Sequence, residues 1–562
     1  MYQIDEEIFE LAKELVRIPS VNGTEGEKTV DEYIEAWFRK VPYYRDHPKD
    51  LIIQKIPGDP LDRRSVLAIL RGTKDDIQRE ASIPTVLLHG HTDTVGIEDY
   101  GSLKKYATDP DALTELLRTS DDIQLPADAR EDLLSGEYCF GRGMSDMKSG
   151  DAVFMVLMKR LSEHPEDIRG NLVASFNPVE ENAHSGIISS LPALVNLRER
   201  EGFRFIAAFN NDFTTRLYAD DEKVTIYTGM GGKILPCFYI QGRETHVGQC
   251  FEGFDASMMA AEILRVIQLS TKYADVDKGE MASPPSVLKL KDLKDFYNVQ
   301  TSREALVYFN YFVLGKSMND ITQELKEAAR DACFEVCRRI RKNREAYTAA
   351  NSLPDTGKEP CVCILSYAEL MEQASGRTGF TTDRLKEIVA DEKAKGTDVR
   401  EIPVALIRYL LSVCGITSPA IVLYYAAPYV PHCTLRYSET EQDAQPGSEQ
   451  AVYMALRATL DSISSTTGTA FRILHYYPSL SDSSYIRIDD DDSSIRNLKE
   501  NFPAIEDLYP IPIDAIRSLD IPPINIGVRG RDAHKWTERV HVPYTFGTLP
   551  ALEHELILKL LQ

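Results

Sequence analysis

Short apolar segments alternate with amphipathic segments along the first 215 residues, and this alternation restricts the possible folds more than any other feature. A short apolar run predicts a buried strand, and a 3.6-residue apolar period predicts a helix. Strands are predicted at 65–70, 85–89, 172–176 and 204–209, and helices at 6–16, 27–39, 147–161 and 186–198. This order indicates an α/β domain with a mixed, largely parallel sheet, whose strands carry functional residues at their carboxyl ends.

The pattern changes near residue 220, and a polar stretch at 438–448 separates a third segment. Between these two points the sequence predicts strands, several helices and one long charged helix. After the polar stretch a helix, a strand and a terminal helix restore the α/β pattern. We therefore expect a discontinuous domain made of residues 1–220 and 441–562, interrupted by an inserted α+β domain at 221–440.

The charge and the cysteines exclude several classes of protein. Asp and Glu number 87 and Lys and Arg number 64, so the net charge is −23, which disfavours a nucleic-acid partner. No stretch approaches the about 18 uninterrupted apolar residues of a membrane-spanning helix, and the acidic N-terminal segment does not resemble a secretory signal. The nine cysteines are scattered, as is typical of reduced thiols. We expect a cytoplasmic protein without a membrane partner.

A histidine and a carboxylate follow the strand predicted at 85–89. His91 comes two positions after this strand, and Asp93 comes two positions later. If His91 binds a metal ion through one ring nitrogen, the other nitrogen needs an acceptor, which Asp93 can supply. A polar loop at a strand end is the alternative.

A glycine-rich segment precedes the helix predicted at 147–161. Gly141 and Gly143 let the backbone turn tightly and bring Asp146 to the sheet edge. The two oxygens of this carboxylate can bridge two cations. A phosphate loop is excluded, because Asp146 stands where the third glycine belongs and its charge would repel a phosphate.

Two further strands are followed by carboxylates. Glu180 and Glu181 come after the strand predicted at 172–176, and adjacent carboxylates repel each other unless a cation or a proton separates them. This favours Glu181 as a metal ligand and Glu180 as a general base, with an ordinary surface pair as the alternative. His184 is interpreted as a helix-start residue, with a site role as the alternative. Asp212 follows the fourth strand, with a neighbouring position as the alternative ligand.

A second histidine comes late in the chain, at His534, after the inserted domain. The candidate ligands are then two histidines and three carboxylates: His91, Asp146, Glu181, Asp212 and His534. This set can hold two divalent ions that share one carboxylate. Mixed imidazole and carboxylate ligation suits Zn²⁺, with Co²⁺ or Mn²⁺ as alternatives.

These motifs resemble those of the co-catalytic zinc aminoacylase and carboxypeptidase family, which includes acetylornithine deacetylase, succinyl-diaminopimelate desuccinylase and peptidase T. The motifs are His91-Thr-Asp93-Thr-Val95, Gly141-Arg-Gly143, Asp146-Met-Lys148, Glu180-Glu181, and the late His534 with Glu538. Within the family the likeness is greatest to long bacterial members that serve arginine utilisation. It covers most of residues 5–275 and about 450–560.

The resemblance implies a zinc-peptidase-like catalytic domain with an inserted lid or dimerisation domain. It implies that Asp146 bridges the two metals, that His91 and Asp212 complete one metal site, and that Glu181 and His534 complete the other. It also implies that Asp93 orients His91 and that Glu180 is the general base. In the inserted domain, His246 would reach the active site of a neighbouring subunit and stabilise the oxyanion. This implies a homodimer, and an exposed hairpin histidine is the alternative.

The resemblance also implies hydrolysis of an amide or peptide bond in a small N-acyl amino acid or dipeptide, within amino-acid and particularly arginine catabolism. The absence of a GxSxG elbow or a paired nucleophilic cysteine favours metal-activated water. Arg529, Arg531 and Arg243 lie in motif segments and are candidates for holding a substrate carboxylate, with plain surface arginines as the alternative. The segment 96–140 is longer than usual for the family and is a candidate lid. A non-catalytic member that binds an amino acid or a partner is the alternative function.

Overall fold

The computed structural model describes residues 3–120, 122–358, 360–440 and 444–562. The chain divides into two compact units. The first unit consists of residues 1–230, 433–488 and 512–562, and the second consists of residues 231–432 and 489–511.

Residues 489–511 belong to the second unit, whereas the sequence analysis placed the whole C-terminal segment in the first. They contain helix α14 (Asp492–Asn501), which packs against the long helix α9 (Met318–Ala350). The backbone N–H of Met318 donates to the Ser494 hydroxyl over 2.8 Å. A local sequence pattern does not reveal this contact, because its partners are far apart in the chain.

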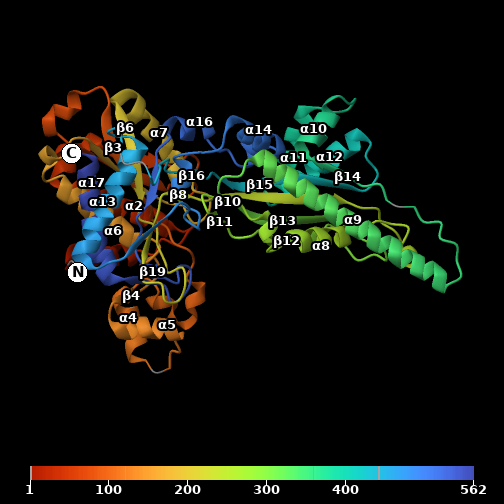
Figure 1. The fold of residues 1–562 in the computed structure, drawn as a ribbon, viewed down its shortest axis with the longest axis horizontal. Helices are drawn as coiled ribbons and strands as arrows, with labels where there is room; N and C mark the ends of the chain where they lie inside the picture. The colour runs from red at the N-terminus through yellow and green to blue at the C-terminus, as the bar shows by residue number, and fades with distance from the viewer. Residues whose placement is uncertain (1–2, 121, 359, 441–443) are drawn as a thin grey trace. The chain divides into compact units, whose positions relative to one another are not determined.

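A mixed eight-stranded sheet forms the centre of the first unit (Figure 1). Its order is β1–β2–β5–β3–β6–β18–β7–β17, and β5, β3, β6 and β18 run parallel. The strands span Leu51–Lys55 (β1), Arg64–Arg71 (β2), Ile83–His91 (β3), Asn171–Asn177 (β5), Phe203–Asn210 (β6), Val224–Tyr227 (β7), Phe471–Leu474 (β17) and Pro523–Asn525 (β18). The predicted α/β class is confirmed, and the four strands predicted in the first 215 residues are present with ends that differ by one or two residues.

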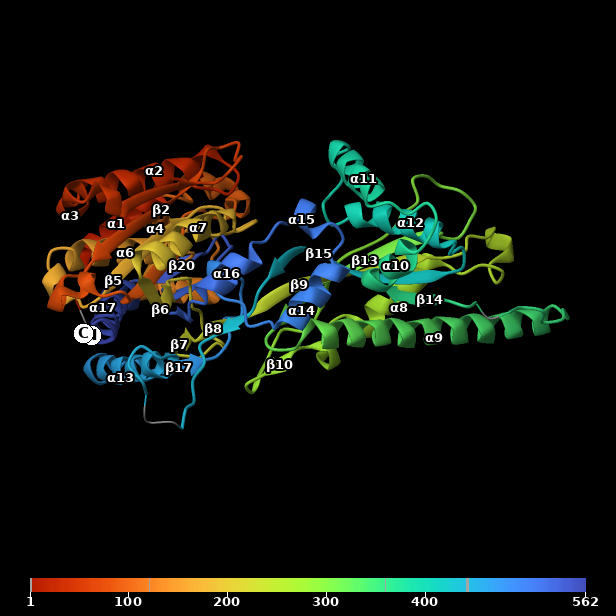
Figure 2. The same cartoon turned by 90° about the horizontal axis from the view of Figure 1, so that it is seen from above.

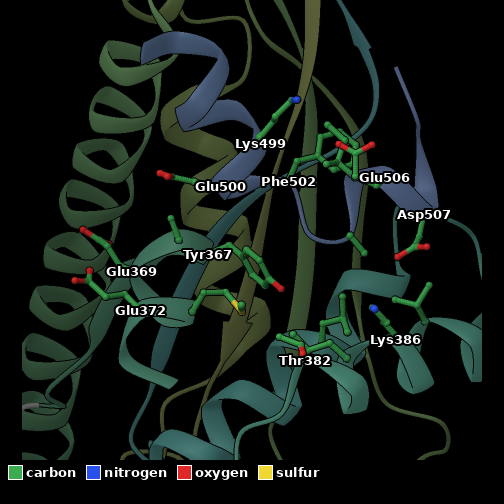
Figure 3. Close-up of a pocket in the computed structure, with 17 residues that line it drawn as sticks. Tyr367, Glu369, Glu372, Thr382, Lys386, Lys499, Glu500, Phe502, Glu506 and Asp507 are labelled. Atoms are coloured by element: carbon green, nitrogen blue, oxygen red, sulfur yellow. The ribbon is translucent and has the colours of Figure 1, made fainter. Parts of the chain in front are cut away.

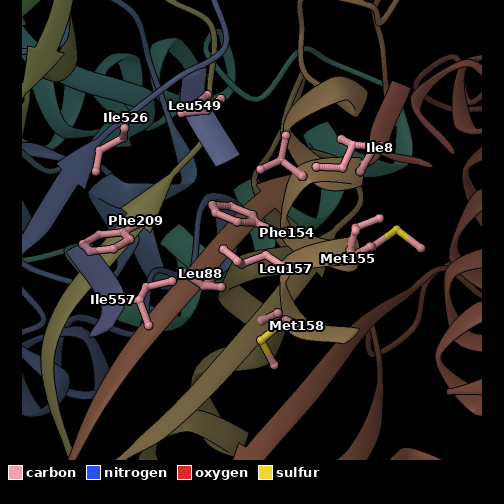
Figure 4. Close-up of a cluster of buried hydrophobic side chains, with 14 of the residues drawn as sticks. Ile8, Leu88, Phe154, Met155, Leu157, Met158, Phe209, Ile526, Leu549 and Ile557 are labelled. Carbon is pink, nitrogen blue, oxygen red and sulfur yellow. The ribbon is translucent and has the colours of Figure 1, made fainter. Parts of the chain in front are cut away.

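Alternate residues of the central strands pack against helices on opposite faces of this sheet. Leu88 of β3 and Phe209 of β6 lie on one face, where Phe154 and Leu157 of α6 meet Ile557 of α17 (Figure 4). The helices on this face include α1 (Glu6–Val16), α2 (Glu25–Lys40), α6 (Lys148–Leu161), α13 (Glu449–Thr467) and α17 (Leu549–Leu560), and α7 (Ser185–Glu201) packs on the opposite face. Each fully buried apolar side chain of this size contributes about 1.5–3 kcal/mol to the free energy of unfolding.

The three central parallel strands end at the same edge of the sheet. His91 pairs with Asn177 at the ends of β3 and β5, and His89 pairs with Asn210 at the end of β6. The loops that follow these strands therefore leave the sheet side by side. They carry Glu180, Glu181 and Asp212, and His91 is the last residue of β3.

The stretch 96–140 forms a small additional layer of the first unit. Its elements are α4 (Pro110–Thr119), α5 (Ala127–Ser135) and β4 (Tyr138–Phe140), and β4 pairs with β20 (Arg539–His541), which pairs with β19 (Gly530–Arg531). Leu113, Leu133 and Phe140 belong to its own apolar cluster. The pairing of β4 with β20 attaches this layer to the segment that contains His534.

A five-stranded sheet forms the centre of the second unit, in the order β12–β13–β9–β15–β14. The strands span Gly232–Gln241 (β9), Ser286–Asp292 (β12), Glu304–Val313 (β13), Cys363–Ser366 (β14) and Ala420–Val430 (β15). Helices α8 (Ala256–Ile267) and α9 cover one face, and α10 (Tyr367–Ser375), α11 (Thr382–Ala394) and α12 (Ile402–Cys414) lie on the other side (Figure 2). Over the part of the chain that the structure describes, no helix has both the length and the apolar character that crossing a bilayer requires.

Candidate metal centre

Five candidate ligands from five separate stretches of chain meet at the sheet edge of the first unit. They form two groups, His91 with Asp146 and Asp212, and Asp146 with Glu181 and His534. In each group, one ligand atom of every residue lies within 4.8 Å of the others. Asp146 belongs to both groups, because its Oδ1 lies 3.0 Å from Nε2 of His91 and its Oδ2 lies 3.0 Å from Nε2 of His534.

This donor set fits two divalent cations. Two imidazole nitrogens and three carboxylates are suitable ligands, and a shared carboxylate is typical of two-metal sites. Without cations the carboxylates repel one another: burial raises the pKa of Asp212 to about 7, and the nearby charge of Asp146 adds to the effect. Hydrogen bonds to Asp146 and Glu181 raise the pKa of His534 to about 10. Both shifts indicate an excess of buried negative charge that cations would neutralise.

A carboxylate from near the C-terminus holds the loop that carries Asp146. Oε1 of Glu538 accepts hydrogen bonds from the backbone N–H groups of Gly143 over 2.8 Å, Ser145 over 3.1 Å and Asp146 over 3.2 Å. Its Oε2 pairs with the Arg142 guanidinium over 2.6 Å. Gly143 has a φ of 84°, a conformation that favours glycine. Glu538 therefore fixes the position of the ligand that both groups share.

Asp93 organises the loop that carries the two glutamates. Its Oδ1 accepts from the backbone N–H of Glu180 over 3.0 Å, and its Oδ2 accepts from that of Glu181 over 3.2 Å. The expected hydrogen bond between this carboxylate and His91 is not formed, because Oδ1 lies 3.7 Å from Nδ1 of His91. The backbone oxygen of Asp93 lies 3.1 Å from the same nitrogen. Asp93 therefore contacts His91 through its carbonyl and the glutamates through its carboxylate.

A cavity of about 280 Å³ opens beside the two ligand groups. Its lining residues are Asp146, Glu180, Glu181, Asn182, His184, Asp212, Phe213, Ser479, Leu480, Ala533 and His534. Burial is the main cause that raises the pKa of Glu180, and the carboxylates of Glu181 and Asp212 raise it further against the opposing effect of His91. A carboxyl group with a raised pKa is suited to take up and release a proton.

His184 precedes α7, as the sequence analysis favoured, and it also lines this cavity. Its Nδ1 lies 3.0 Å from Oδ1 of Asp482, and its ring centre lies 4.8 Å from that of Tyr485. Asp482, Ser479 and Leu480 were not predicted from the sequence. They lie in a polar segment without a regular period, so no sequence signal marked them.

The arginines that the sequence analysis offered for the substrate do not bring charge to this cavity. No arginine or lysine is among the described residues that line it. Arg529 donates to the backbone oxygen of Glu222 over 3.3 Å and lines a different cavity. Arg531 forms an ion pair with Asp132 over 2.9 Å. Both are close in sequence to His534, but Arg529 lines a cavity with Arg216 and His541, and Arg531 lines another with Asp128 and Tyr218.

The remaining two candidates, His246 and Arg243, lie in the second unit and are exposed. The Nδ1 of His246 accepts a hydrogen bond from the backbone N–H of Gly248 over 3.1 Å. An exposed position is compatible with both predictions for His246, a hairpin histidine and a residue that reaches a partner subunit.

The second unit also contains a cavity of about 700 Å³, between α10, α11 and residues 499–507 (Figure 3). Its wall is largely apolar and includes Met371, Leu385 and Phe502. None of the candidate ligands or catalytic residues lines it. The groups of metal-ligand type found among the described residues are the two at the sheet edge of the first unit.

The chain is similar to known proteins over nearly its whole length. Residues 87–458 match the model of peptidase family M20/M25/M40. Protein RocB of Bacillus subtilis (strain 168) is 35% identical over 560 residues, which cover 99% of this chain and 95% of that protein. The uncharacterized protein YqjN of the same strain is 31% identical over 553 residues, which cover 98% of this chain and 96% of that protein. The crystal structure of aminopeptidase PepT from Bacillus cereus ATCC 10987 has the same fold, with a TM-score of 0.53, 13% identity and 100% of both chains covered.

Proposed function

Because this chain belongs to peptidase family M20/M25/M40, we propose that it cleaves an amide or peptide bond of a small N-acyl amino acid or dipeptide. The observation that carries this proposal is the position of Asp146, which the two ligand groups share beside a cavity lined by Glu180. Two divalent cations held there, Zn²⁺ in our assignment with Co²⁺ or Mn²⁺ as alternatives, would supply Lewis-acid activation of water and of the scissile carbonyl.

In this proposal Glu180 moves the proton. Its carboxylate takes a proton from the attacking water and then delivers it to the nitrogen that leaves. The raised pKa of Glu180, caused mainly by burial, supports this assignment because the carboxyl group can hold the proton between the two transfers. Glu180 belongs to neither ligand group, so its carboxylate can exchange a proton without giving up a metal ion.

We assign stabilisation of the oxyanion to His246 of the partner subunit, in a homodimer formed through the second unit. The exposure of His246 supports this assignment, because an exposed side chain is available to another copy of the chain. A preorganised hydrogen-bond donor aimed at the developing charge makes a large contribution to catalysis.

We propose an arginine-related substrate and a role in amino-acid catabolism in the cytoplasm. The likeness of the motifs to those of bacterial arginine-utilisation proteins supports this proposal, whereas the carboxylates that line the cavity are already assigned to the cations and to proton transfer. The nine cysteines are free thiols, which supports a reducing compartment. Arg529 and Arg531 line other cavities and are left out of the substrate site, whereas Arg243 is exposed on the second unit like His246 and is retained as a candidate that the partner subunit supplies for the substrate carboxylate.

The test is hydrolysis of a defined panel by protein loaded with Zn²⁺, Co²⁺ or Mn²⁺. The panel contains N-acetyl-arginine, N-acetyl-leucine and dipeptides with arginine at either end, and release of the free amine is measured. We expect hydrolysis of at least one member, with arginine compounds preferred. Protein that binds two ions but hydrolyses no member would contradict the proposal and support the non-catalytic binding function.

A further inference from the structure

The cavity beside the ligands contains a histidine that the assigned metal, base and oxyanion roles do not use. His184 is only 3% exposed and lines the cavity together with Glu180, whose Oε1 lies 3.8 Å from its Nδ1. The backbone of His184 has a φ of 53°, in the left-handed region that residues with side chains rarely adopt. Such conformations persist where the surrounding structure requires them, often at functional sites.

The ring of His184 is fixed from two sides. Asp482, itself 3% exposed, lies with its Oδ1 3.0 Å from Nδ1 of His184, and the ring of Tyr485 packs against the imidazole. Because a carboxylate accepts at Nδ1, the proton of the neutral ring is placed on Nδ1 and the lone pair on Nε2. No described residue forms a hydrogen bond with Nε2 of His184. Nε2 is also not one of the fully buried side-chain atoms that lack a hydrogen-bond partner, so it is accessible. Nε2 is therefore open to the cavity that His184 lines.

We propose that His184 is a substrate-binding residue whose Nε2 accepts a hydrogen bond from the N–H of the scissile amide. The inference rests on the proposed function and extends it to a substrate class, secondary amides and peptide bonds with a hydrogen on the leaving nitrogen. When His184 accepts this hydrogen, the lone pair that develops on the nitrogen can turn toward Glu180. Glu180 must deliver a proton to that lone pair, so His184 positions the substrate for the step that releases the amine.

Two substitutions separate the two nitrogens of the ring. In His184→Asn the amide N–H takes the place of Nδ1–H and keeps the bond to Asp482, but no atom replaces Nε2. In His184→Gln the amide reaches the position of Nε2 but loses the bond to Asp482. A third substitution, Asp482→Asn, keeps both nitrogens and removes the carboxylate that fixes the proton on Nδ1. His164→Asn, at an exposed histidine, is the control.

The measurement compares the N-acyl amino acid that the wild type hydrolyses best with its N-methyl counterpart, which lacks the N–H. The ratio of kcat/KM for these two substrates is the readout, since a structural defect would lower both values equally. We expect the ratio to fall about ten-fold in His184→Asn, to fall in Asp482→Asn, and to be partly kept in His184→Gln. The control should keep the wild-type ratio, and the metal content should not change in His184→Asn.

An unchanged ratio in His184→Asn, or an equal loss for both substrates, would overturn the proposal. If the wild type hydrolyses no N-acyl amino acid, the proposed function fails, and N-acetyl-arginine and its N-methyl counterpart are then compared by titration calorimetry. In that case a preference for the secondary amide that is present in the wild type and lost in His184→Asn would still support the role of His184. Equal preference in the two proteins, or no binding by either, would overturn it.

Discussion

The backbone N–H of Asp146 donates a hydrogen bond to the buried carboxylate of Glu538 over 3.2 Å, across 392 residues of sequence. The same oxygen of Glu538 accepts from Gly143 and Ser145. The C-terminal part of the first unit thus fixes the loop that carries the shared ligand. This contact explains in physical terms why the site depends on both ends of a discontinuous unit.

Glu538→Gln should lower both the stability of the protein and its affinity for metal. Arg142 is only 1% exposed and would keep its pair with Asp99 over 3.0 Å but lose the charge of Glu538, and the loss of such a charged hydrogen bond costs about 1.5–3 kcal/mol of the free energy of unfolding. The loosened loop would also hold Asp146 less precisely. Urea unfolding measures the first effect and metal titration the second. Glu163→Gln, at an exposed glutamate, is the matched control, and a loss as small as that of the control would contradict the anchoring role.

Glu180→Gln should abolish most of the turnover without removing the metal. The amide cannot take up a proton, and a general base typically contributes about 10²–10⁴-fold to the rate. Glu180 is in neither ligand group, so the metal content should equal that of the wild type. Both quantities are measured on the same preparation, with Glu163→Gln as the control. Turnover that survives the substitution would remove the base assignment.

The shared active site predicts complementation between two inactive variants. His246→Asn and Glu180→Gln should each have little activity as pure dimers. In a mixed dimer, the chain that keeps Glu180 receives His246 from the other chain, so one of its two sites is intact. Co-expression in equal amounts should restore about a quarter of the wild-type activity, because half of the dimers are mixed. If His246 acts within its own subunit or not at all, the mixture will show no recovery above the pure variants.

His541 should make the protein less stable at acid pH. Burial, together with the charge of Arg529, lowers the pKa of His541 to about 4 from 6.5. As the pH falls, the unfolded chain therefore binds a proton at His541 before the folded chain does. The contribution of neutral His541 to the free energy of unfolding is complete above pH 6.5 and is lost as the pH falls toward about 4. His541→Asn keeps an acceptor for the backbone N–H of Tyr544 but does not titrate. Between pH 6.5 and about 5 the wild type should lose about 2 kcal/mol more than the variant in urea unfolding, and parallel curves would contradict the prediction.

The fold class could be predicted because its signal is local. The apolar runs that became β3, β5 and β6 are continuous in sequence, and the ends of parallel strands meet at one edge. For the same reason the sequence grouped His91, Glu181 and Asp212, whereas Asp146 and His534 lie in loops outside these strand ends. The helices α4 and α5 within 96–140 were not predicted individually, because their apolar cluster is small. Residues 489–511 belong to the second unit because of a long-range contact with α9, which no local pattern predicts.

The parts of the site that could not be predicted depend on side-chain direction. Arg531 is close in sequence to His534 but turns toward Asp132, where it forms an ion pair. His184 has the expected place before α7, yet only the structure shows that Asp482 holds its ring at the cavity. The sequence pattern predicts where a residue lies along a strand or loop, whereas the partner of its side chain depends on tertiary packing.

The most direct test of the two-metal site is the metal content of the purified protein, measured by mass spectrometry without added metal and again after dialysis against Zn²⁺, Co²⁺ or Mn²⁺. Because Asp146 belongs to both ligand groups and Asp212 to only one, the wild type should hold two ions per chain, Asp212→Asn one, and Asp146→Asn fewer than either. Two ions in the wild type and this order among the variants are the result that the shared-carboxylate site predicts. A wild type that binds no ion even after dialysis, or an Asp146→Asn variant that keeps both, would contradict it.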